Sequence, residues 1–92
     1  MKKGTDREKI KYKKTLSCRE TEYLSLAALG YKNKETAGIL CVSYFTVKKT
    51  FESIFKKLSA KDRANAVAIA FIFGILTADT LLDIKIKYHL NT

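Results

Sequence analysis

The sequence predicts an all-α fold: a four-helix domain that begins with a flexible basic arm and continues into an additional short helix at its C-terminal end. The chain has 92 residues, with no proline and only 4 glycines. An all-β protein needs many turns, which depend on these two residue types, so helices with short connections are favoured. Apolar residues also recur at helical spacing, most regularly at Val47, Phe51, Ile54 and Leu58. This length suits one small domain.

The arm and the first helix occupy the first third of the chain. Residues 1–14 are mostly polar and show no sustained apolar period, which is typical of a flexible segment. The first helix covers "LSCRETEYLSLAALG", residues 16–30. Ser17 is its predicted cap, with Glu20 three residues later as in a capping box, and Gly30 is its predicted end. Its apolar stripe consists of Leu16, Tyr23, Leu24, Ala27 and Ala28.

Two further helices follow, one short and one long. The short helix runs from about Asn33, its predicted cap, to Cys41. The long helix begins at Ser43, which is also a capping residue, and ends at Leu58. The residues expected to face inward are Ala37 and Leu40 in the short helix and Val47, Phe51, Ile54 and Leu58 in the long one.

The fourth helix contains the most apolar run of the chain. It is expected to begin near Lys61 or Asp62 and to carry "AVAIAFIFGIL", residues 66–76. A bilayer span needs roughly 20 residues, so this run is too short to cross a membrane. It is better interpreted as a helix buried on more than one side, against its own core and a second chain. Residues 15–77 thus form the predicted domain.

Residues 78–92 form the predicted C-terminal helical extension. Its helix covers "TLLDIKIKYHL", with Asp79 as the expected cap. Leu82, Ile86 and Leu90 are expected to face inward. The alternation within the segment also fits a strand, but a lone strand would have no partner here.

The charge of the chain is large and unevenly placed. The net charge is +9, which suggests an anionic partner: nucleic acid, an acidic protein or an anionic membrane surface. Residues 1–14 carry seven basic and two acidic residues, and residues 32–61 carry the same numbers, an excess of +5 in each. The remaining residues carry four basic and five acidic ones, a balance of −1. The two basic stretches are therefore the candidate contact regions.

The sequence offers no chemistry for a metal site or an enzyme. Cys18 and Cys41 form no CxxC pair, and His89 is the only histidine, so we expect no bound metal or cofactor. Both cysteines are predicted to be small packing residues of a protein in a reducing cytoplasm. There is no Cys–His or Ser–His–Asp constellation, no glycine-rich phosphate loop and no convincing carboxylate pair.

The spacing of the second and third helices is typical of a helix-turn-helix unit, here about residues 33–57. A helix of about eight residues is followed by a turn of two or three residues and a longer capped helix. In such a unit the second helix can lie in a major groove about 12 Å wide. Spacing alone fits an antiparallel helical hairpin equally well, but the basic excess in the same stretch favours contact with DNA.

Residues 16–67 resemble the LuxR/FixJ/GerE-type DNA-binding domain of bacterial transcription regulators. The family patterns are Leu-Thr-x-Arg-Glu, a glycine before the second helix, Asn-Lys-Glu-Ile-Ala, Ser-x-x-Thr-Val-Lys, a closing Lys-Leu and Arg-x-x-Ala. They match, in order, Leu16, Ser17, Arg19, Glu20, Gly30, Asn33, Lys34, Glu35, Thr36, Ala37, Ser43, Thr46, Val47, Lys48, Lys57, Leu58, Arg63 and Ala66. Such members often carry a sensor domain upstream, so the chain resembles a small stand-alone member or an excised output domain.

The resemblance implies a four-helix domain whose third helix reads the major groove and whose fourth mediates dimerisation. From their place in the third helix, the expected base-reading residues are Lys48, Lys49 and Glu52. The expected contacts to the DNA backbone are Asn33, Lys34, Ser43, Tyr44, Thr46, Ser53, Lys56 and Lys57. The expected dimer contacts are Val67, Ala70, Phe71, Phe73 and Gly74.

Several residues depart from the family pattern or allow a second interpretation. Thr36 replaces a core aliphatic residue, and its hydroxyl is expected to bond the carbonyl oxygen of Lys32. Tyr44 and Phe45 replace a polar pair, and they either pack within the protein or lie against DNA sugars and thymine methyl groups. Glu52 accepts from a cytosine amino group, or it is only an ion partner of the lysine one turn earlier.

Three classes of function remain. The first is a sequence-specific regulator of transcription that binds double-stranded DNA as a homodimer, in the cytoplasm at the nucleoid. The second is an interaction protein that keeps the fold but uses Tyr44, Phe45 and the fourth helix to bind another regulator. The third, a basic module for the membrane surface, would use the arm and the apolar run; we expect no membrane partner.

Overall fold

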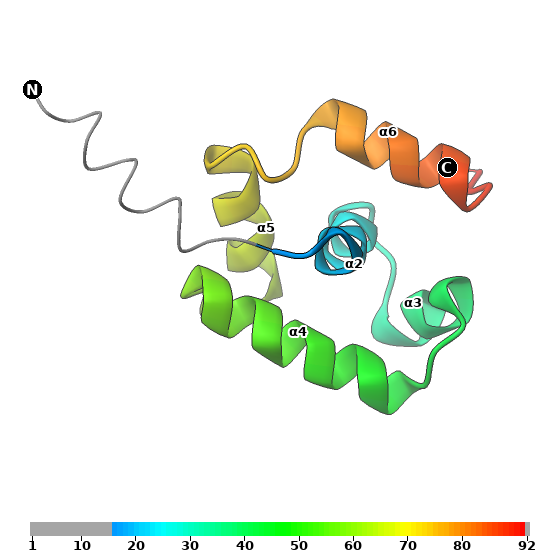
Figure 1. Ribbon diagram of the computed structural model, residues 1–92, viewed down its shortest axis with the longest axis horizontal. Helices are drawn as coiled ribbons and strands as arrows, with labels where there is room; N and C mark the ends of the chain where they lie inside the picture. The colour runs from blue at the N-terminus through cyan, green and yellow to red at the C-terminus, as the bar shows by residue number, and fades with distance from the viewer. Residues whose placement is uncertain (1–15, 92) are drawn as a thin grey trace, which may run out of the picture.

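The computed structural model describes residues 16–91, and this part of the chain consists of helices joined by short turns, without a strand (Figure 1). The prediction of an all-α fold is therefore confirmed. The predicted basic arm, residues 1–14, lies outside the described residues. The helices are α2 (Cys18–Ala28), α3 (Asn33–Leu40), α4 (Tyr44–Leu58), α5 (Arg63–Ile72) and α6 (Ala78–Lys87).

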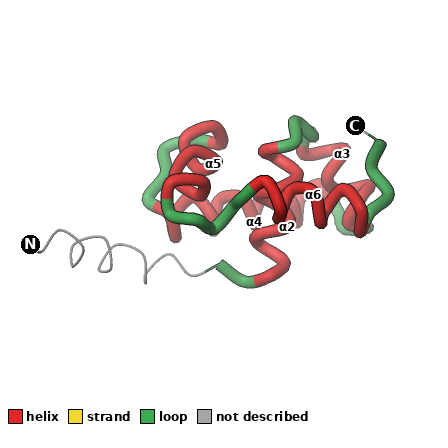
Figure 2. The backbone as a smooth tube through the Cα atoms, turned by 90° about the horizontal axis from the view of Figure 1, so that it is seen from above, coloured by secondary structure: helices red, strands yellow, loops and turns green. Residues whose placement is uncertain are grey.

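Helix α2 is the centre of the fold, because it packs against each of the other four helices. Helices α4 and α6 lie on opposite sides of it (Figure 1), and α5 and α3 flank it on its two other sides (Figures 1 and 2). A helix enclosed in this way buries more than one stripe. Four consecutive residues of α2 are buried accordingly, namely Tyr23, Leu24, Ser25 and Leu26.

Both ends of α2 are closed by local hydrogen bonds, as the sequence predicted. The hydroxyl of Ser17 accepts from the Glu20 N–H at 3.0 Å, and the Glu20 carboxylate accepts from the Ser17 N–H at 2.9 Å. At the other end Gly30 has a φ of +97°, which glycine adopts without strain. The Tyr31 N–H then bonds the carbonyl of Leu26 at 3.0 Å, which ends the helix in a Schellman turn.

Helices α3 and α4 form the helix-turn-helix unit. The chain turns between them at Cys41, whose φ of 58° is left-handed, and α4 ends at Ser59, whose φ of 55° is left-handed too. Ser43 caps α4 as predicted, because its hydroxyl accepts from the Thr46 N–H at 3.0 Å. The inward-facing residues of α4 were also predicted correctly: Val47, Phe51, Ile54 and Leu58 are buried.

The start of α3 differs from the prediction. Asn33 is the first residue of the helix and not its cap. Lys32 holds the cap position, where its backbone N–H donates to the Glu35 carboxylate at 2.7 Å. The carboxylate of Glu35 thus closes this end and leaves the Asn33 side chain to bond Arg63 instead.

Helix α5 is shorter than the apolar run that predicted it. It starts at Arg63, after Asp62 caps it by accepting from the Asn65 N–H at 2.8 Å, and it ends at Ile72. Gly74, with a φ of +76°, lets the chain turn back after the helix. Leu76 then enters the core with 1% of its surface exposed. The end of the run is therefore a connection that supplies a core residue, and not the last turn of a helix.

Helix α6 is present, but its predicted orientation was wrong. Thr77, and not Asp79, caps it by accepting from the Thr80 N–H at 3.2 Å. Ile84 is the residue that α6 buries, whereas Leu82 and Ile86 are 54% and 68% exposed. The alternation of polar and apolar residues permits several rotations of this helix, and contacts with α2 select one of them.

Those contacts centre on the carboxylate of Glu22. It accepts from the Tyr88 hydroxyl at 2.7 Å and from the Lys87 ammonium, and Arg19 donates to it at 3.2 Å. Burial alone raises the pKa of Glu22, but the bonds from Lys87, Tyr88 and Arg19 outweigh burial and lower this pKa below its usual value. Arg19 also donates to the Leu40 carbonyl at 3.1 Å, so this cluster connects α6 and α2 to the end of α3.

The exposure of the two cysteines and the length of the helices bear on two further predictions. Cys18 and Cys41 are both exposed, so the prediction that they pack in the core was wrong. Each stands at a helix end, where the backbone faces solvent. None of the helices within residues 16–91 is both long enough and apolar enough to span a bilayer.

One buried hydroxyl has no hydrogen-bond partner among the described residues. Thr36 is fully buried in α3, and its Oγ1 makes no bond, although the carbonyl of Lys32 was the predicted acceptor. That carbonyl accepts the Thr36 backbone N–H at 2.8 Å instead. Ser25, equally buried in α2, does bond, because its hydroxyl donates to the Thr21 carbonyl at 2.8 Å.

Removal of the Thr36 hydroxyl and removal of the Ser25 hydroxyl should change the stability of the protein in opposite directions. Thr36→Val keeps the shape and removes the unpaired hydroxyl, so it should raise the free energy of unfolding by about 1 kcal/mol. Ser25→Ala removes a satisfied bond and should lower it by about 1 kcal/mol. Urea denaturation followed by circular dichroism measures both changes. A Thr36→Val variant less stable than the natural chain would mean that the hydroxyl has a partner.

Candidate nucleic-acid interface

The surface of α4 opposite its buried face carries the candidate interface. Because four inward residues fix one face of the helix, Phe45, Lys49, Glu52 and Lys56 at i, i+4, i+7 and i+11 form a stripe on the other side. All four are exposed. We call them the outer stripe.

Most cations of this surface have no acidic partner among the described residues. Within residues 16–91, no ion pair involves four of the lysines predicted to contact DNA, Lys34 of α3 and Lys48, Lys49 and Lys56 of α4. Glu52 is likewise unpaired in this part of the chain, so the alternative of an ion pair with Lys48 is not realised. Lys48 and Lys49 lie instead over the rings of Tyr44 and Phe45, at 5.9 and 5.6 Å from the ring centroids.

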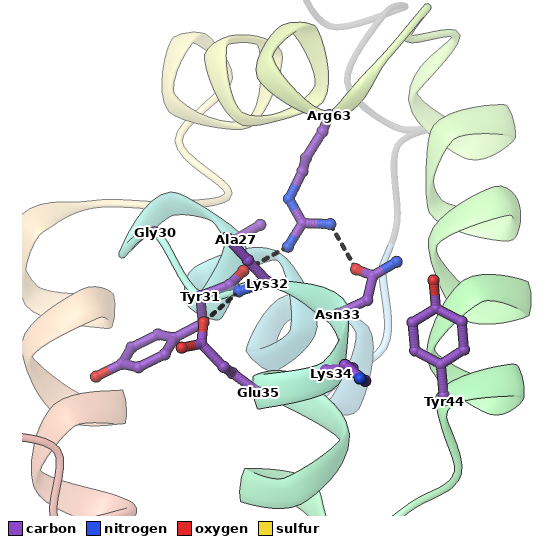
Figure 3. Close-up of a pocket in the computed structure, with 9 residues that line it drawn as sticks. All are labelled: Ala27, Gly30, Tyr31, Lys32, Asn33, Lys34, Glu35, Tyr44 and Arg63. Atoms are coloured by element: carbon purple, nitrogen blue, oxygen red, sulfur yellow. Dashed lines mark hydrogen bonds between the residues drawn. The ribbon is translucent and has the colours of Figure 1, made fainter.

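A shallow hollow adjoins the start of α4. Figure 3 shows Tyr44 on one side of it and the start of α3, with Asn33 and Lys34, facing that ring. Arg63 reaches into the hollow from the start of α5. The hollow therefore joins three of the residues predicted to contact the DNA backbone, although they come from two helices.

Arg63 holds this region together. Its guanidinium donates to the Tyr31 carbonyl and to the Asn33 side chain, both at 2.7 Å (Figure 3). It also lies 4.5 Å from the centroid of the Phe51 ring. Burial lowers the pKa of Arg63 from its usual value. From the sequence Arg63 matched only a family position; its role depends on partners about 30 residues away, which no local pattern indicates.

Two predicted backbone contacts are engaged inside the protein. The Asn33 side-chain oxygen accepts from Arg63, and the Lys57 ammonium binds both carboxylate oxygens of Glu20 at 2.9 Å. Burial alone raises the pKa of Glu20, but bonds from Ser17 and Lys57 outweigh it and lower this pKa. Lys57 therefore connects α4 to α2, unlike the lysines of the outer stripe.

The predicted dimer contacts on and after α5 differ in how much of their surface is exposed. Ala70 is fully buried in the core of this chain, so its side chain offers no surface to a second copy. Phe71 is 42% exposed and Gly74 is exposed, whereas Val67 and Phe73 are half-buried. Ile72, which was not among the predicted contacts, is 74% exposed. Among the described residues, no group of histidine, cysteine and carboxylate side chains could hold a metal ion.

The role of Arg63 leads to a prediction about stability. Arg63→Lys keeps the charge but replaces a planar fork by a single ammonium group, which cannot reach both acceptors and stack on Phe51. The free energy of unfolding should fall by roughly 1.5–3 kcal/mol, the range for a hydrogen bond to a charged group. The reverse exchange at an exposed position of the same hollow, Lys34→Arg, is the control and should change stability by under about 0.5 kcal/mol. Equal urea midpoints for the two variants would contradict this role.

The geometry can now be compared with known proteins. The sequence model of bacterial regulatory proteins of the LuxR family matches residues 14–70. The transcriptional regulatory protein YdfI of Bacillus subtilis strain 168 is 45% identical over 64 residues, which are 70% of this chain and 30% of YdfI. The response regulator protein VraR of Staphylococcus aureus strain Mu3 is 39% identical over 61 residues, 66% of this chain and 29% of VraR.

The family model covers α2, α3, α4 and most of α5, and it stops before α6. The chain spans about three tenths of the length of these curated relatives. No solved structure is significantly similar to it. Since the family model spans more than half of the 92 residues, the chain belongs to the LuxR family of bacterial regulatory proteins.

Proposed function

We propose that the chain is a sequence-specific regulator of transcription that binds double-stranded DNA. One observation carries the proposal: the exposed side of the second helix of a helix-turn-helix unit bears cations that no acid of residues 16–91 neutralises. Membership of the family supports it, as do the printed names of YdfI, a transcriptional regulatory protein, and VraR, a response regulator. The predicted arm, outside the described residues, would add seven further basic residues.

In this proposal α4 lies in the major groove with its N-terminus toward the DNA backbone. Lys49 and Glu52, on the outer stripe, face base edges, where lysine donates to guanine and a carboxylate accepts from the cytosine amino group. Lys48, on the flank beside Tyr44, is the third base-reading residue. The proposed backbone contacts are Lys34, Ser43, Tyr44, Thr46, Ser53 and Lys56; the bonds of Asn33 and Lys57 within the protein make them supports of the interface instead.

We further propose a two-fold homodimer through α5. Phe71 and Ile72 expose 42% and 74% of their surface at the end of this helix, and Phe73 continues the apolar segment. Val67 and Gly74 complete the proposed contact, while Ala70 serves the core beneath it. A second copy would remove these apolar groups from water.

A second candidate function rests on the aromatic pair at the start of α4. Tyr44 is 50% and Phe45 is 66% exposed, and exposed aromatic residues are frequent in protein interfaces. The chain would then use this surface to bind another regulator instead of DNA.

Selection of bound duplexes from a random pool separates the two candidates. A regulator that reads DNA as a dimer should enrich one motif with two-fold symmetry, because each copy reads one half-site. Sequencing of the bound fraction gives the motif. A bound fraction without sequence preference would contradict the first candidate and favour the second. A motif without internal symmetry would contradict the dimer alone.

The roles on α4 can be tested with that motif. Lys49→Ala and Glu52→Ala should each change which base is preferred at one position per half-site, by about 1–3 kcal/mol. Binding of each folded variant to a panel of single-base substitutions measures the preference. Lys34→Ala is the control, because loss of a phosphate contact weakens all duplexes alike. An unchanged ranking of the panel for both α4 variants would contradict base reading by the outer stripe.

A further inference from the structure

Phe45 is the one apolar member of the outer stripe. Its ring is 66% exposed, although it stands in line with Lys49, Glu52 and Lys56 on the side of α4 that faces away from the core. Lys49 lies over the ring at 5.6 Å from its centroid, which leaves most of the ring surface open. Contact with water does not stabilise an exposed phenyl ring. The ring contributes a favourable free energy only when an apolar group covers it and removes its surface from water.

The neighbouring aromatic residue is placed differently. Tyr44 lies on the flank of α4, lines the hollow beside Lys34 and has a hydroxyl group that can bond a phosphate oxygen (Figure 3). Phe45 has no polar atom in its side chain, and it is aligned one turn before Lys49 on the proposed base-reading stripe. The two rings therefore need different ligands.

The groove that α4 would enter offers one kind of apolar group on its floor, the C5-methyl group of thymine. We propose that Phe45 reads thymine by packing its ring against this methyl group. The inference rests on the proposed function and names part of the DNA sequence it requires. Phe45 and Lys49 are four residues apart, about 6 Å along the helix, so the thymine lies within about two base pairs of the base that Lys49 contacts.

The position of the ring among unpaired lysines argues for DNA over a protein partner. Lys48 and Lys49 stand three and four residues after Phe45, one helical turn away. Lys34 lies across the hollow from Tyr44. A partner that covers Phe45 must therefore also accept a cluster of positive charge. The major groove does so, because phosphates line it and guanine presents two acceptors on its floor.

The test removes the methyl group and nothing else. In the duplex selected from the random pool, each thymine is replaced in turn by deoxyuridine, which pairs identically but lacks the C5-methyl group. One thymine per half-site should show a loss of affinity of about fourfold. This factor corresponds to about 0.8 kcal/mol, the value for burying one methyl-sized group, at 1.4 kcal/mol per tenfold.

Two variants assign the effect to the ring. Phe45→Ala should bind the thymine and the deoxyuridine duplexes equally, whereas Phe45→Leu, which keeps an apolar side chain, should retain a preference for thymine. Tyr44→Ala is the matched control: it should weaken both duplexes by the same factor and keep the fourfold difference. Circular dichroism confirms that each variant is folded.

Each other outcome overturns the inference in a recognisable way. If no thymine shows a penalty, or if the penalty persists in Phe45→Ala, the ring does not read the methyl group, while binding of DNA stands. If Phe45→Ala leaves the affinity for every duplex unchanged, the ring belongs to a protein contact. If the pool yields no preferred sequence at all, the proposed function fails as well.

Discussion

The guanidinium group of Arg63 is the constraint on which the geometry of the helix-turn-helix unit depends. It is a single planar cation at the start of α5, bonded to the loop before α3 and to the first residue of α3, and stacked on a ring of α4. Because this one group contacts three segments, it fixes their mutual distances. Displacement of any segment would break a hydrogen bond or the ring contact of a charged, partly buried side chain.

The acids and bases of the chain are divided between two tasks. Glu20 and Glu22 of α2 bind Lys57, Lys87 and Arg19, and so hold α4 and α6 onto the central helix. Glu20 and Glu22 are thereby engaged within the molecule, and no acid of residues 16–91 pairs with Lys34 or with the lysines of the outer stripe. The excess of +5 in residues 32–61 therefore reaches the surface largely undiminished.

The predictions that proved correct rest on residues close together in the sequence. The inward face of α4, the cap at Ser43 and the capping box of Ser17 and Glu20 depend on residues within three or four positions of one another, so the sequence alone sufficed. The errors concern contacts between distant segments. Nothing local indicates that Arg63 takes the Asn33 side chain and Glu20 takes Lys57, or that α6 turns Ile84 inward instead of Leu82. Nor does any local pattern indicate that the Thr36 hydroxyl stays without a partner among the described residues, since the Thr21 and Ser25 hydroxyls of α2 do bond the carbonyl four residues earlier.

The division of α4 into a buried and an exposed face has a consequence for evolution within the family. Its start is fixed by Ser43, its end by the left-handed residue Ser59, and its rotation by the four inward residues. None of these determinants lies on the outer stripe. In the proposed function, substitutions there would change the bases that α4 prefers at little cost in stability, so new specificities would arise by single substitutions that leave the protein folded.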